Sequence, residues 1–259
     1  ITKHTDVNNW INHITVLPPI SPNVVRVRTS DGEPPVKGKW TTYETATRIP
    51  GTLDIYDVYK SGTDFHQLLA DSTNVTEVLG ANTTGITTTF NMFRGCNLLT
   101  SVVLFDTSSV TDMKYMFQDC SSLTSVPLFD TSKVTTMNYM FQNCGSLTSV
   151  PLFDTSKVTT MDSMFFRCHS LASVPLFDTS NVTNMHQMLM DNTSLTTVPL
   201  FDTSNVTNMG GMLQGCYSLT SLPLFNTSKV TDMSYAFNTC DRVESGALAL
   251  YQQASTQAT

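Results

Sequence analysis

Apolar residues recur along most of the chain with a period of 24 positions. The stretch from Val126 to Cys144 reads VPLFDTSKVTTMNYMFQNC, and the stretch from Val150 to Cys168 reads VPLFDTSKVTTMDSMFFRC. The same period holds for a column of leucines at Leu104, Leu128, Leu152, Leu176, Leu200 and Leu224. A fixed period of this length is typical of a solenoid, in which stacked coils bury their apolar edges against one another.

Within one coil, the apolar spacing first predicts a strand and then a turn. Leu123, Val126 and Leu128 predict a short strand that faces the core, so Leu152→Ala in the next coil is expected to lower the free energy of unfolding by about 2–5 kcal/mol. The Phe-Asp-Thr-Ser stretch that follows predicts a turn, because Asp and Ser side chains bond nearby backbone N–H groups. Proline occupies the 127 column in five of six coils and cannot donate to a sheet ladder, so the ladder is expected to be interrupted there.

The second half of the coil predicts another strand and a helix. The Lys-Val-Thr stretch, with its β-branched Val and Thr, predicts a second short strand. Apolar residues at offsets of 3, 4 and 7 follow Met137, namely Met140, Phe141 and Cys144, and predict a helix of one or two turns with its inner face packed. Twelve methionines fill two columns, positions 113 to 233 and 92 to 212, and are expected to pack in the core.

The composition restricts the partners. The chain has a net charge of −7, 40% hydrophobic residues and 14% charged residues. This is enough apolar material for a core, and the acidic balance argues against binding to nucleic acid or to anionic membranes. No apolar run approaches the roughly 18 residues of a membrane span, so direct membrane insertion is not expected. Because the chain begins at Ile1, it is expected to be a processed or truncated piece.

All six cysteines fall into a single column of the repeat. They are Cys96, Cys120, Cys144, Cys168, Cys216 and Cys240, and Asn192 fills the remaining slot. Equivalent positions in stacked coils have parallel Cα–Cβ vectors about 5 Å apart, whereas a disulfide requires two Cβ atoms that face each other. The column is therefore expected to contain reduced, buried thiols rather than disulfides or a metal site.

A second column is acidic. It comprises Asp106, Asp130, Asp154, Asp178 and Asp202, with Asn226 in the last coil. Each side chain is expected to cap its own turn. A ladder of calcium ions is the alternative, although the chain lacks the G-G-x-G-x-D pattern of calcium-binding coils. Thr131 and Thr155, which follow this column without variation, are expected to be exposed.

Variation between the coils is concentrated around the cysteine column. The positions after the first Met of each coil and those flanking the Cys carry aromatic, Arg and His side chains that are rare elsewhere. The candidate ligand-binding residues are Lys114, Tyr115, Asn138, Tyr139, Phe166, Arg167, His169, His186, Gln187, Tyr217 and Tyr235. Such side chains dominate recognition surfaces. Two alternatives remain open, which are free drift of solvent-facing positions and a contact with a sister subunit.

Residues that would indicate catalysis do not form a recognisable pattern. The five histidines are scattered, and none has a local spacing to Ser, Cys or Asp that indicates a triad. The chain also lacks a Gly-rich phosphate loop. The sequence therefore predicts a protein that is not an enzyme and that uses no cofactor and no metal.

The sequence of the repeats resembles a known family. The L-x-x-V-x-L spacing followed by M-F-x-x-C-x-S-L is similar to the leucine-rich repeats of BspA-like bacterial surface proteins. The stretch FDTSNVTNM, from Phe201 to Met209, resembles the surface-protein repeat of mycoplasma lipoprotein-like families. This resemblance implies a leucine-rich-repeat solenoid outside cells that serves adhesion and recognition, and similar arrays occur in bacteriophage structural proteins.

The predicted architecture is an α/β solenoid, a leucine-rich-repeat-like stack of about seven coils over residues 65–240. Each coil is expected to contain a short strand, a turn, a short strand and a short helix. Residues 1–21 are expected to form an extended arm, residues 22–64 a small β-rich N-terminal cap, and residues 241–259 a short C-terminal cap helix and linker.

The predicted function is recognition or adhesion on a bacterial surface or a phage particle. The expected partner is a cell-surface glycan or protein, and the N-terminal arm is a candidate contact to other virion or surface proteins. The alternative is a purely structural decoration or spacer. Fold analogy alone favours the first interpretation.

Overall fold

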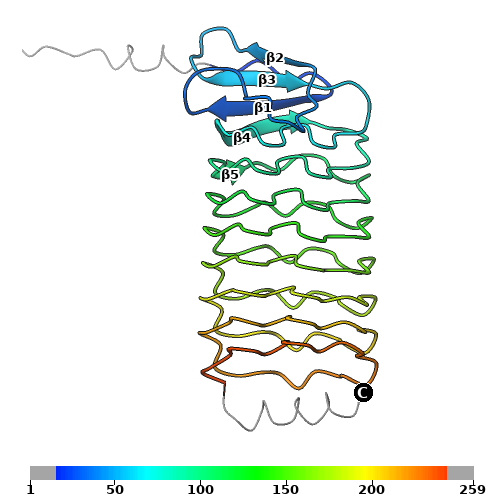
Figure 1. Ribbon diagram of the computed structural model, residues 1–259. Coiled ribbons are helices and arrows are strands. Elements are labelled where there is room, and N and C mark those ends of the chain that lie inside the picture. The colour runs from blue at the N-terminus through cyan, green and yellow to red at the C-terminus, as the bar shows by residue number, and fades with distance from the viewer. Residues whose placement is uncertain (1–15, 244–259) are drawn as a thin grey trace, which may run out of the picture.

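The computed structural model describes residues 16–243, which form a single elongated stack of coils with a small sheet at its N-terminal end (Figure 1). The stack confirms the predicted solenoid. Most of the predicted N-terminal arm and of the predicted C-terminal cap helix lies outside the described residues.

The N-terminal sheet has five strands, β1 (Val24–Thr29), β2 (Thr45–Arg48), β3 (Ile55–Tyr59), β4 (Val75–Asn82) and β5 (Ser101–Val102). Their spatial order is β2-β3-β1-β4-β5, and all pairings are antiparallel except that of β4 with β5. Because β4 belongs to the first coil, the antiparallel β1–β4 pair joins the N-terminal strands to the stack. This arrangement covers the open end of the solenoid, which would otherwise expose unpaired backbone groups.

An ion pair with a buried arginine lies at the centre of this sheet. Arg26 of β1 is 3% exposed, and its Nε and Nη2 donate to the two carboxylate oxygens of Asp57 in β3 at 2.6 and 2.8 Å. Its Nη1 donates to the backbone oxygen of Pro18 at 2.7 Å. Three charge-assisted bonds therefore satisfy a guanidinium that has almost no access to water.

The regular ladder ends after β5, as the proline column predicts. In the second coil, Val103 occupies the proline column, and its N–H donates to the oxygen of Val78 in the preceding coil at 3.2 Å. The later coils have Pro at this position and therefore lack the donor. In the described coils after β5, the predicted strands are reduced to isolated pairs of residues.

Those isolated pairs hold the stack in register at intervals of 24 residues. Parallel bridges run from Asp64 to Thr88 and continue through each coil to Asp232. Beside them, the N–H and the hydroxyl of Thr135 both donate to the oxygen of Thr111, at 3.0 and 3.3 Å. Equivalent residues of neighbouring coils are therefore directly stacked.

The predicted helix is wrong within the described residues, where the segment 113–120 forms a run of tight turns instead. The N–H of Met116 donates back to Met113 at 3.3 Å within the coil, whereas the N–H of Phe117 donates to Met140 of the next coil at 3.0 Å. In a helix, the N–H of Phe117 would bond to the oxygen of Met113. Because every second N–H bonds to the neighbouring coil, the stack replaces the helical hydrogen bonds while the apolar spacing still points the same residues inward.

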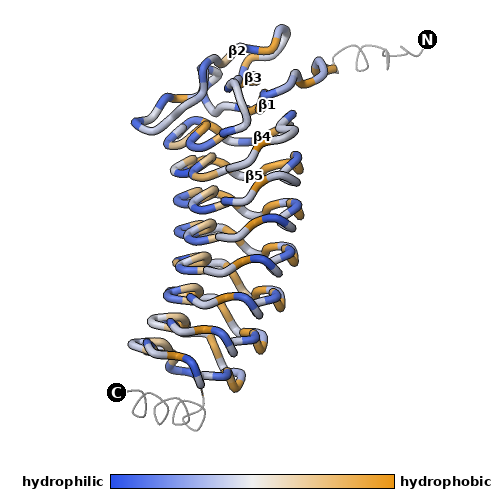
Figure 2. The backbone as a smooth tube through the Cα atoms, turned by 90° about the vertical axis from the view of Figure 1, so that its right-hand side faces the viewer, coloured by the Kyte–Doolittle hydropathy of each residue, from blue (hydrophilic) through white to orange (hydrophobic). Residues whose placement is uncertain are grey.

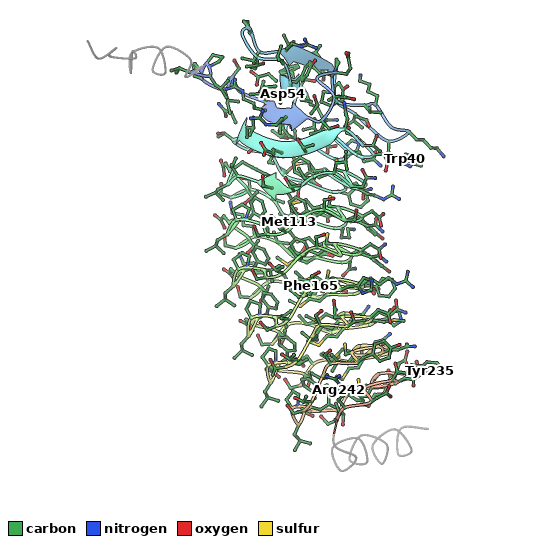
Figure 3. The ribbon with its side chains drawn as sticks, turned by 90° about the vertical axis from the view of Figure 1, so that its left-hand side faces the viewer. Trp40, Asp54, Met113, Phe165, Tyr235 and Arg242 are labelled. Atoms are coloured by element: carbon green, nitrogen blue, oxygen red, sulfur yellow. The ribbon has the colours of Figure 1, made fainter. Side chains whose placement is uncertain are left out.

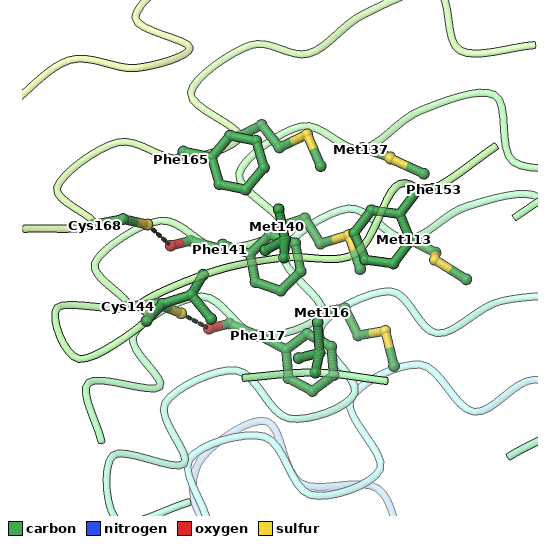
Figure 4. Packing of buried hydrophobic residues seen from close by; sticks show 14 of the residues in the cluster. Met113, Met116, Phe117, Met137, Met140, Phe141, Cys144, Phe153, Phe165 and Cys168 are labelled. Atoms are coloured by element: carbon green, nitrogen blue, oxygen red, sulfur yellow. Dashed lines mark hydrogen bonds between the residues drawn. The ribbon is translucent and has the colours of Figure 1, made fainter. Parts of the chain in front are cut away.

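The core consists of identical residues stacked along the axis. Phe141 lies between Phe117 and Phe165, with ring centroids 5.7 and 5.6 Å apart and ring planes within 6° (Figure 4). Met116 and Met140 are fully buried beside them. Both methionine columns are buried apart from the partly buried Met233, which confirms their role in the core. Apolar positions recur at the same places in every coil (Figure 2). The prediction that one coil buries its apolar edges on the next is confirmed.

The leucine column is the largest departure from the sequence prediction. Leu128 and Leu152, expected in the core, are 58% and 59% exposed, and the whole column from Leu104 to Leu224 faces solvent. The reason is local, because the N–H of Phe129 donates to the oxygen of Pro127 at 3.0 Å and closes a three-residue turn centred on Leu128. This turn points Leu128 outward, although Val126 and Phe129 on either side of the turn are buried.

The acidic column caps turns as predicted. The N–H and the hydroxyl of Ser132 donate to Asp130 Oδ1 at 3.0 and 2.7 Å, and these bonds hold the pKa of Asp130 below its usual value. Thr131 was expected to be exposed, and this is wrong, since it is 2% exposed. Its hydroxyl donates to the backbone oxygen of Asp154 in the next coil at 2.8 Å. Thr155 is buried in the same way, so these hydroxyls form a ladder between coils.

The cysteines are free and buried, as predicted. Cys144 Sγ lies 3.1 Å from the backbone oxygen of Phe117, a contact that recurs along the column (Figure 4). Burial raises the pKa of Cys96 and of Cys216 to about 12. The thiolate form is therefore suppressed at neutral pH.

We expect a thiol reagent to find almost no reactive group in the folded protein at mildly alkaline pH and all six after denaturation. The measurement is a colorimetric thiol titration with and without denaturant. A disulfide between Cys120 and Cys144 in a peptide map would contradict it.

Asn192→Cys is expected to be neutral or mildly stabilising. Asn192 is fully buried, and its Nδ2 donates at 2.9 Å to Phe165, in the place where a cysteine of the column donates its thiol. Its Oδ1 has no hydrogen-bond partner, and replacing it removes an unsatisfied buried acceptor. A denaturant midpoint well below that of the parent would show that the slot requires the amide.

Candidate functional site

The candidate binding residues lie on the run of turns in each coil. Positions equivalent to 115 and 119 have positive φ, for example 58° at Tyr115 and 59° at Arg167. Asn, Asp and Gly adopt this left-handed conformation at the lowest cost, and the two columns contain all three, for example Asn91, Asp119 and Gly215. In the 119 column, six of the eight residues are Asn, Asp or Gly, and this frequency was the sequence signal for the turn.

Tyrosine and arginine are unusual at such positions. A left-handed conformation costs a non-Gly residue roughly 1–2 kcal/mol. Three tyrosines nevertheless have it, with φ of 58° at Tyr115, 60° at Tyr139 and 57° at Tyr235. The turn itself accepts Gly at the same place, as Gly211 shows. The large side chains are therefore not required by the backbone.

One group of candidates forms an aromatic row. The rings of Tyr115 and Tyr139 stack with centroids 4.7 Å apart and planes 8° apart, and Phe90 contacts Tyr115 edge-on at 5.6 Å. The Lys114 ammonium lies 5.6 Å from the centre of the Phe90 ring. Phe90 was missed in the sequence, although the 24-residue register places it in the same column as Lys114.

Polar contacts extend this row into the next coils. Asp162 accepts from the Tyr139 hydroxyl at 3.3 Å and lies 3.3 Å from His186 Nδ1. Asn138 Oδ1 accepts from the N–H of Asp162 at 3.1 Å. Burial and the neighbouring Asp162 carboxylate raise the pKa of Tyr139, which keeps its phenol neutral. Asp162, which sequence reasoning did not select, thus joins three of the predicted residues.

A second group surrounds Asp191. Arg167 Nε lies 3.3 Å from the Asp191 carboxylate, and the guanidinium lies 4.8 Å from the centre of the Phe166 ring. His169 Nδ1 is 2.9 Å from the backbone oxygen of Asp191. Arg167 is 53% exposed along its side chain, so its charge remains accessible to a ligand.

The remaining candidates extend the surface without joining these groups. Gln187 is half-buried, and its Oε1 lies 3.5 Å from the Ser163 hydroxyl. Tyr217 and Tyr235 are 48% and 69% exposed, and Tyr235 projects from the edge of the stack near its C-terminal end (Figure 3). We refer to the eleven predicted residues together with Phe90, Asp162 and Asp191 as the ridge.

The ridge combines flat aromatic faces, cations and carboxylates at the spacing of the coils. Aromatic faces stack on sugar rings or on apolar side chains, and the charged groups can orient a ligand by hydrogen bonds and ion pairs. Within residues 16–243, no group of three or more His, Cys, Asp or Glu side chains is positioned to hold a metal ion. The same part of the chain contains no helix long and apolar enough to cross a bilayer.

Comparison with known families identifies the repeat. The model of the family described as "Mycoplasma protein of unknown function, DUF285" matches residues 63–167 and 146–249, well over half of the chain. The chain belongs to the DUF285 family. The resemblance of its repeats to mycoplasma and BspA-like surface-protein repeats is thereby confirmed.

A solved structure supports the fold of this DUF285 chain. A leucine-rich repeat protein of T. pallidum (TpLRR) is similar with a TM-score of 0.51 and 24% identity, over 70% of this chain and 77% of the other. A leucine-rich repeat protein from Eubacterium ventriosum has a TM-score of 0.47 and 20% identity, over 70% of this chain and 43% of the other. Among curated proteins, none matches. The first similarity supports a leucine-rich-repeat solenoid for the DUF285 chain.

Proposed function

We propose that this protein is a non-enzymatic recognition module, displayed on a bacterial surface or a phage particle, that binds a cell-surface glycan or protein through the ridge. Membership of a leucine-rich-repeat surface-protein family supports an interaction role. The observation that carries the proposal is the stacked Tyr115–Tyr139 pair, in which both residues have positive φ.

The physical argument concerns conformational cost. The turn tolerates Asn or Gly at these positions, so tyrosine and arginine there reduce stability relative to residues that the same column already uses. Strained residues of this kind gather where a ligand is bound. Tyrosine also supplies a large contact area with few rotatable bonds, which reduces the entropy lost on binding.

The experiment replaces ridge residues with residues from other coils of the same repeat. Tyr139→Asn, Phe166→Gln and Arg167→Asn introduce the residues found at Asn91, Gln142 and Asn143. Because Asn favours positive φ, the triple variant should fold at least as well as the parent. Aromatic anchors cost about 2 kcal/mol or more when removed, so affinity should fall about 30-fold or more.

Binding is measured with the labelled chain on a glycan array and on a panel of bacterial and host cells. The matched control is Ser125→Ala with Ser149→Ala, two exposed positions outside the ridge, which should bind like the parent. If the triple variant binds as well as the parent, variation on the ridge is drift. If the parent binds none of the targets, the scaffold alternative replaces the proposal.

A further inference from the structure

A continuous apolar stripe runs along the stack, away from the ridge. It consists of the leucine column, Leu104, Leu128, Leu152, Leu176, Leu200 and Leu224, whose members are 58–71% exposed. We call it the leucine ladder. Leu104, Leu128 and Leu152 line an open groove of about 720 Å³, beside the carboxylates of Asp106 and Asp130.

The side chains of the leucine ladder and those of the ridge project from opposite sides of each coil. Phe129, next to Leu128, packs in the core against Phe117, on the run of turns of the preceding coil, with ring centroids 6.2 Å apart. The leucines and the ridge residues, which both point away from this shared core, therefore lie on different sides of the stack. A partner on the leucine ladder does not obstruct the aromatic row.

The exposed columns that do not vary differ in what their side chains do. Those of the Asp130 and Thr135 columns make hydrogen bonds within the chain, whereas the leucine side chains make none. Asp130 caps its own turn, and Thr135 donates to the preceding coil. Leu128 has no polar group to contribute, and most of its side chain is in water. Other surface columns vary between coils, as the 133 column shows with Ser109, Lys133, Lys157, Asn181, Asn205 and Lys229. Six unvarying exposed leucines therefore indicate a role between molecules.

We propose that the leucine ladder is the interface through which two copies of this chain pair side by side, with their stacks parallel. The first argument is the period. Six identical side chains recur at the coil spacing, and a second copy presents the same spacing along its whole length. Identical ladders of this kind interdigitate as in paired sheets with a 4.7–4.8 Å repeat.

The second argument is area. Each leucine leaves on the order of 100 Å² of apolar surface in water, so the ladder exposes roughly 600 Å² on each copy, close to the roughly 800 Å² per partner of a standard stable interface. An apolar patch of this size on a monomer marks an interaction site.

The charges decide the orientation. The Asp130 column runs along one flank of the ladder, and hydrogen bonds from Ser132 hold the pKa of Asp130 low, so the row stays ionised. A two-fold axis parallel to the stack places the two acidic rows on opposite flanks of the interface. An antiparallel pairing would bring both rows to the same flank and add repulsion between like charges.

The first test is sedimentation of the 259-residue chain and two matched variants. The parent should form a dimer. Leu128→Gln with Leu152→Gln, both at exposed positions, should leave the thermal unfolding midpoint of the monomer unchanged and weaken dimerisation roughly 100-fold or more. Lys133→Gln with Lys157→Gln, exposed on the same coils, should dimerise like the parent.

Salt separates pairing of copies from binding of a basic partner. Because each copy carries a net charge of −7, raising the salt concentration should tighten the dimer by screening repulsion. A groove built for a cationic peptide would instead bind more weakly in salt. A parent that remains monomeric up to about 100 µM, or a leucine variant that dimerises as tightly as the parent, overturns the proposal.

The second test fixes the orientation and uses the inert native thiols. A single Leu104→Cys supplies an accessible thiol at one end of the ladder, while the native cysteines are buried. Parallel pairing places the two new thiols opposite each other, and a short bismaleimide should link the two chains. Tyr217→Cys, exposed on the ridge, should not be linked. Failure of Leu104→Cys to cross-link in a sample that is dimeric overturns the parallel interface.

This inference does not depend on the proposed recognition function. If the ridge binds nothing, the dimer is still measurable by sedimentation. If both hold, the dimer presents two ridges outward, and its avidity for a surface with many ligands should exceed the affinity of one chain.

Discussion

Phe141→Ala should lower the free energy of unfolding by about 3–5 kcal/mol, because it removes a fully buried ring and leaves a cavity in the middle of the stack. The ring lies between Phe117 and Phe165 and also contacts Phe153, at 6.3 Å between centroids. Coils on both sides therefore lose contacts. The measurement is chemical denaturation followed by circular dichroism.

Leu152→Ala is the matched control. This leucine is 59% exposed, so its removal should change the free energy of unfolding of the monomer by no more than about 0.5 kcal/mol. The measurement is made in dilute solution, where the chain is monomeric. Equal losses for Phe141→Ala and Leu152→Ala would contradict the orientation of the leucine column described above.

Arg26→Ala should destabilise the protein by about 3 kcal/mol, because it leaves the Asp57 carboxylate, which is only 24% exposed, without its partner. The loss also removes the bond to Pro18, which holds the chain segment leading into β1. Since β1 joins the N-terminal sheet to β4 of the first coil, we expect the N-terminal end of the stack to open first. Hydrogen exchange should show faster exchange in β1, β3 and β4 than in the central coils.

Arg28→Ala, two residues along β1, is the control for charge. Arg28 donates to Asp54 and Glu77 at 2.7 and 2.9 Å, but its side chain is 39% exposed. Exposed ion pairs contribute about 1 kcal/mol or less, so this change should be several-fold milder than Arg26→Ala. A similar loss for both variants would show that burial is not what makes the Arg26 pair important.

The sequence predicted the candidate site only in part. The repeats identified the variable columns, because a position that differs between otherwise identical repeats can be recognised from the sequence alone. It did not reveal that Tyr115 and Tyr139 stack at 4.7 Å, nor that Asp162 joins Asn138, Tyr139 and His186. Those contacts connect different coils, so they depend on the stacking geometry.

The sequence by itself determined the repeat, its register and the columns that stack. A period of 24 residues indicates a stack in which each coil buries the apolar edge of the next. The burial of the thiols, methionines and phenylalanines follows from this stacking. The interruption of the hydrogen-bond ladder at Pro127 was also predictable, because proline lacks a backbone N–H in any fold.

Only the tertiary structure decided how each coil satisfies its backbone and which apolar residues it leaves in water. The spacing of Met137, Met140 and Phe141 suits a helix, but alternate N–H groups find their acceptors in the neighbouring coil, and turns result. Leu128 has the hydrophobicity of a core residue, yet a three-residue turn points it outward. Periodicity reports which positions are equivalent, whereas the direction of a side chain depends on hydrogen bonds that exist only once the coils are stacked.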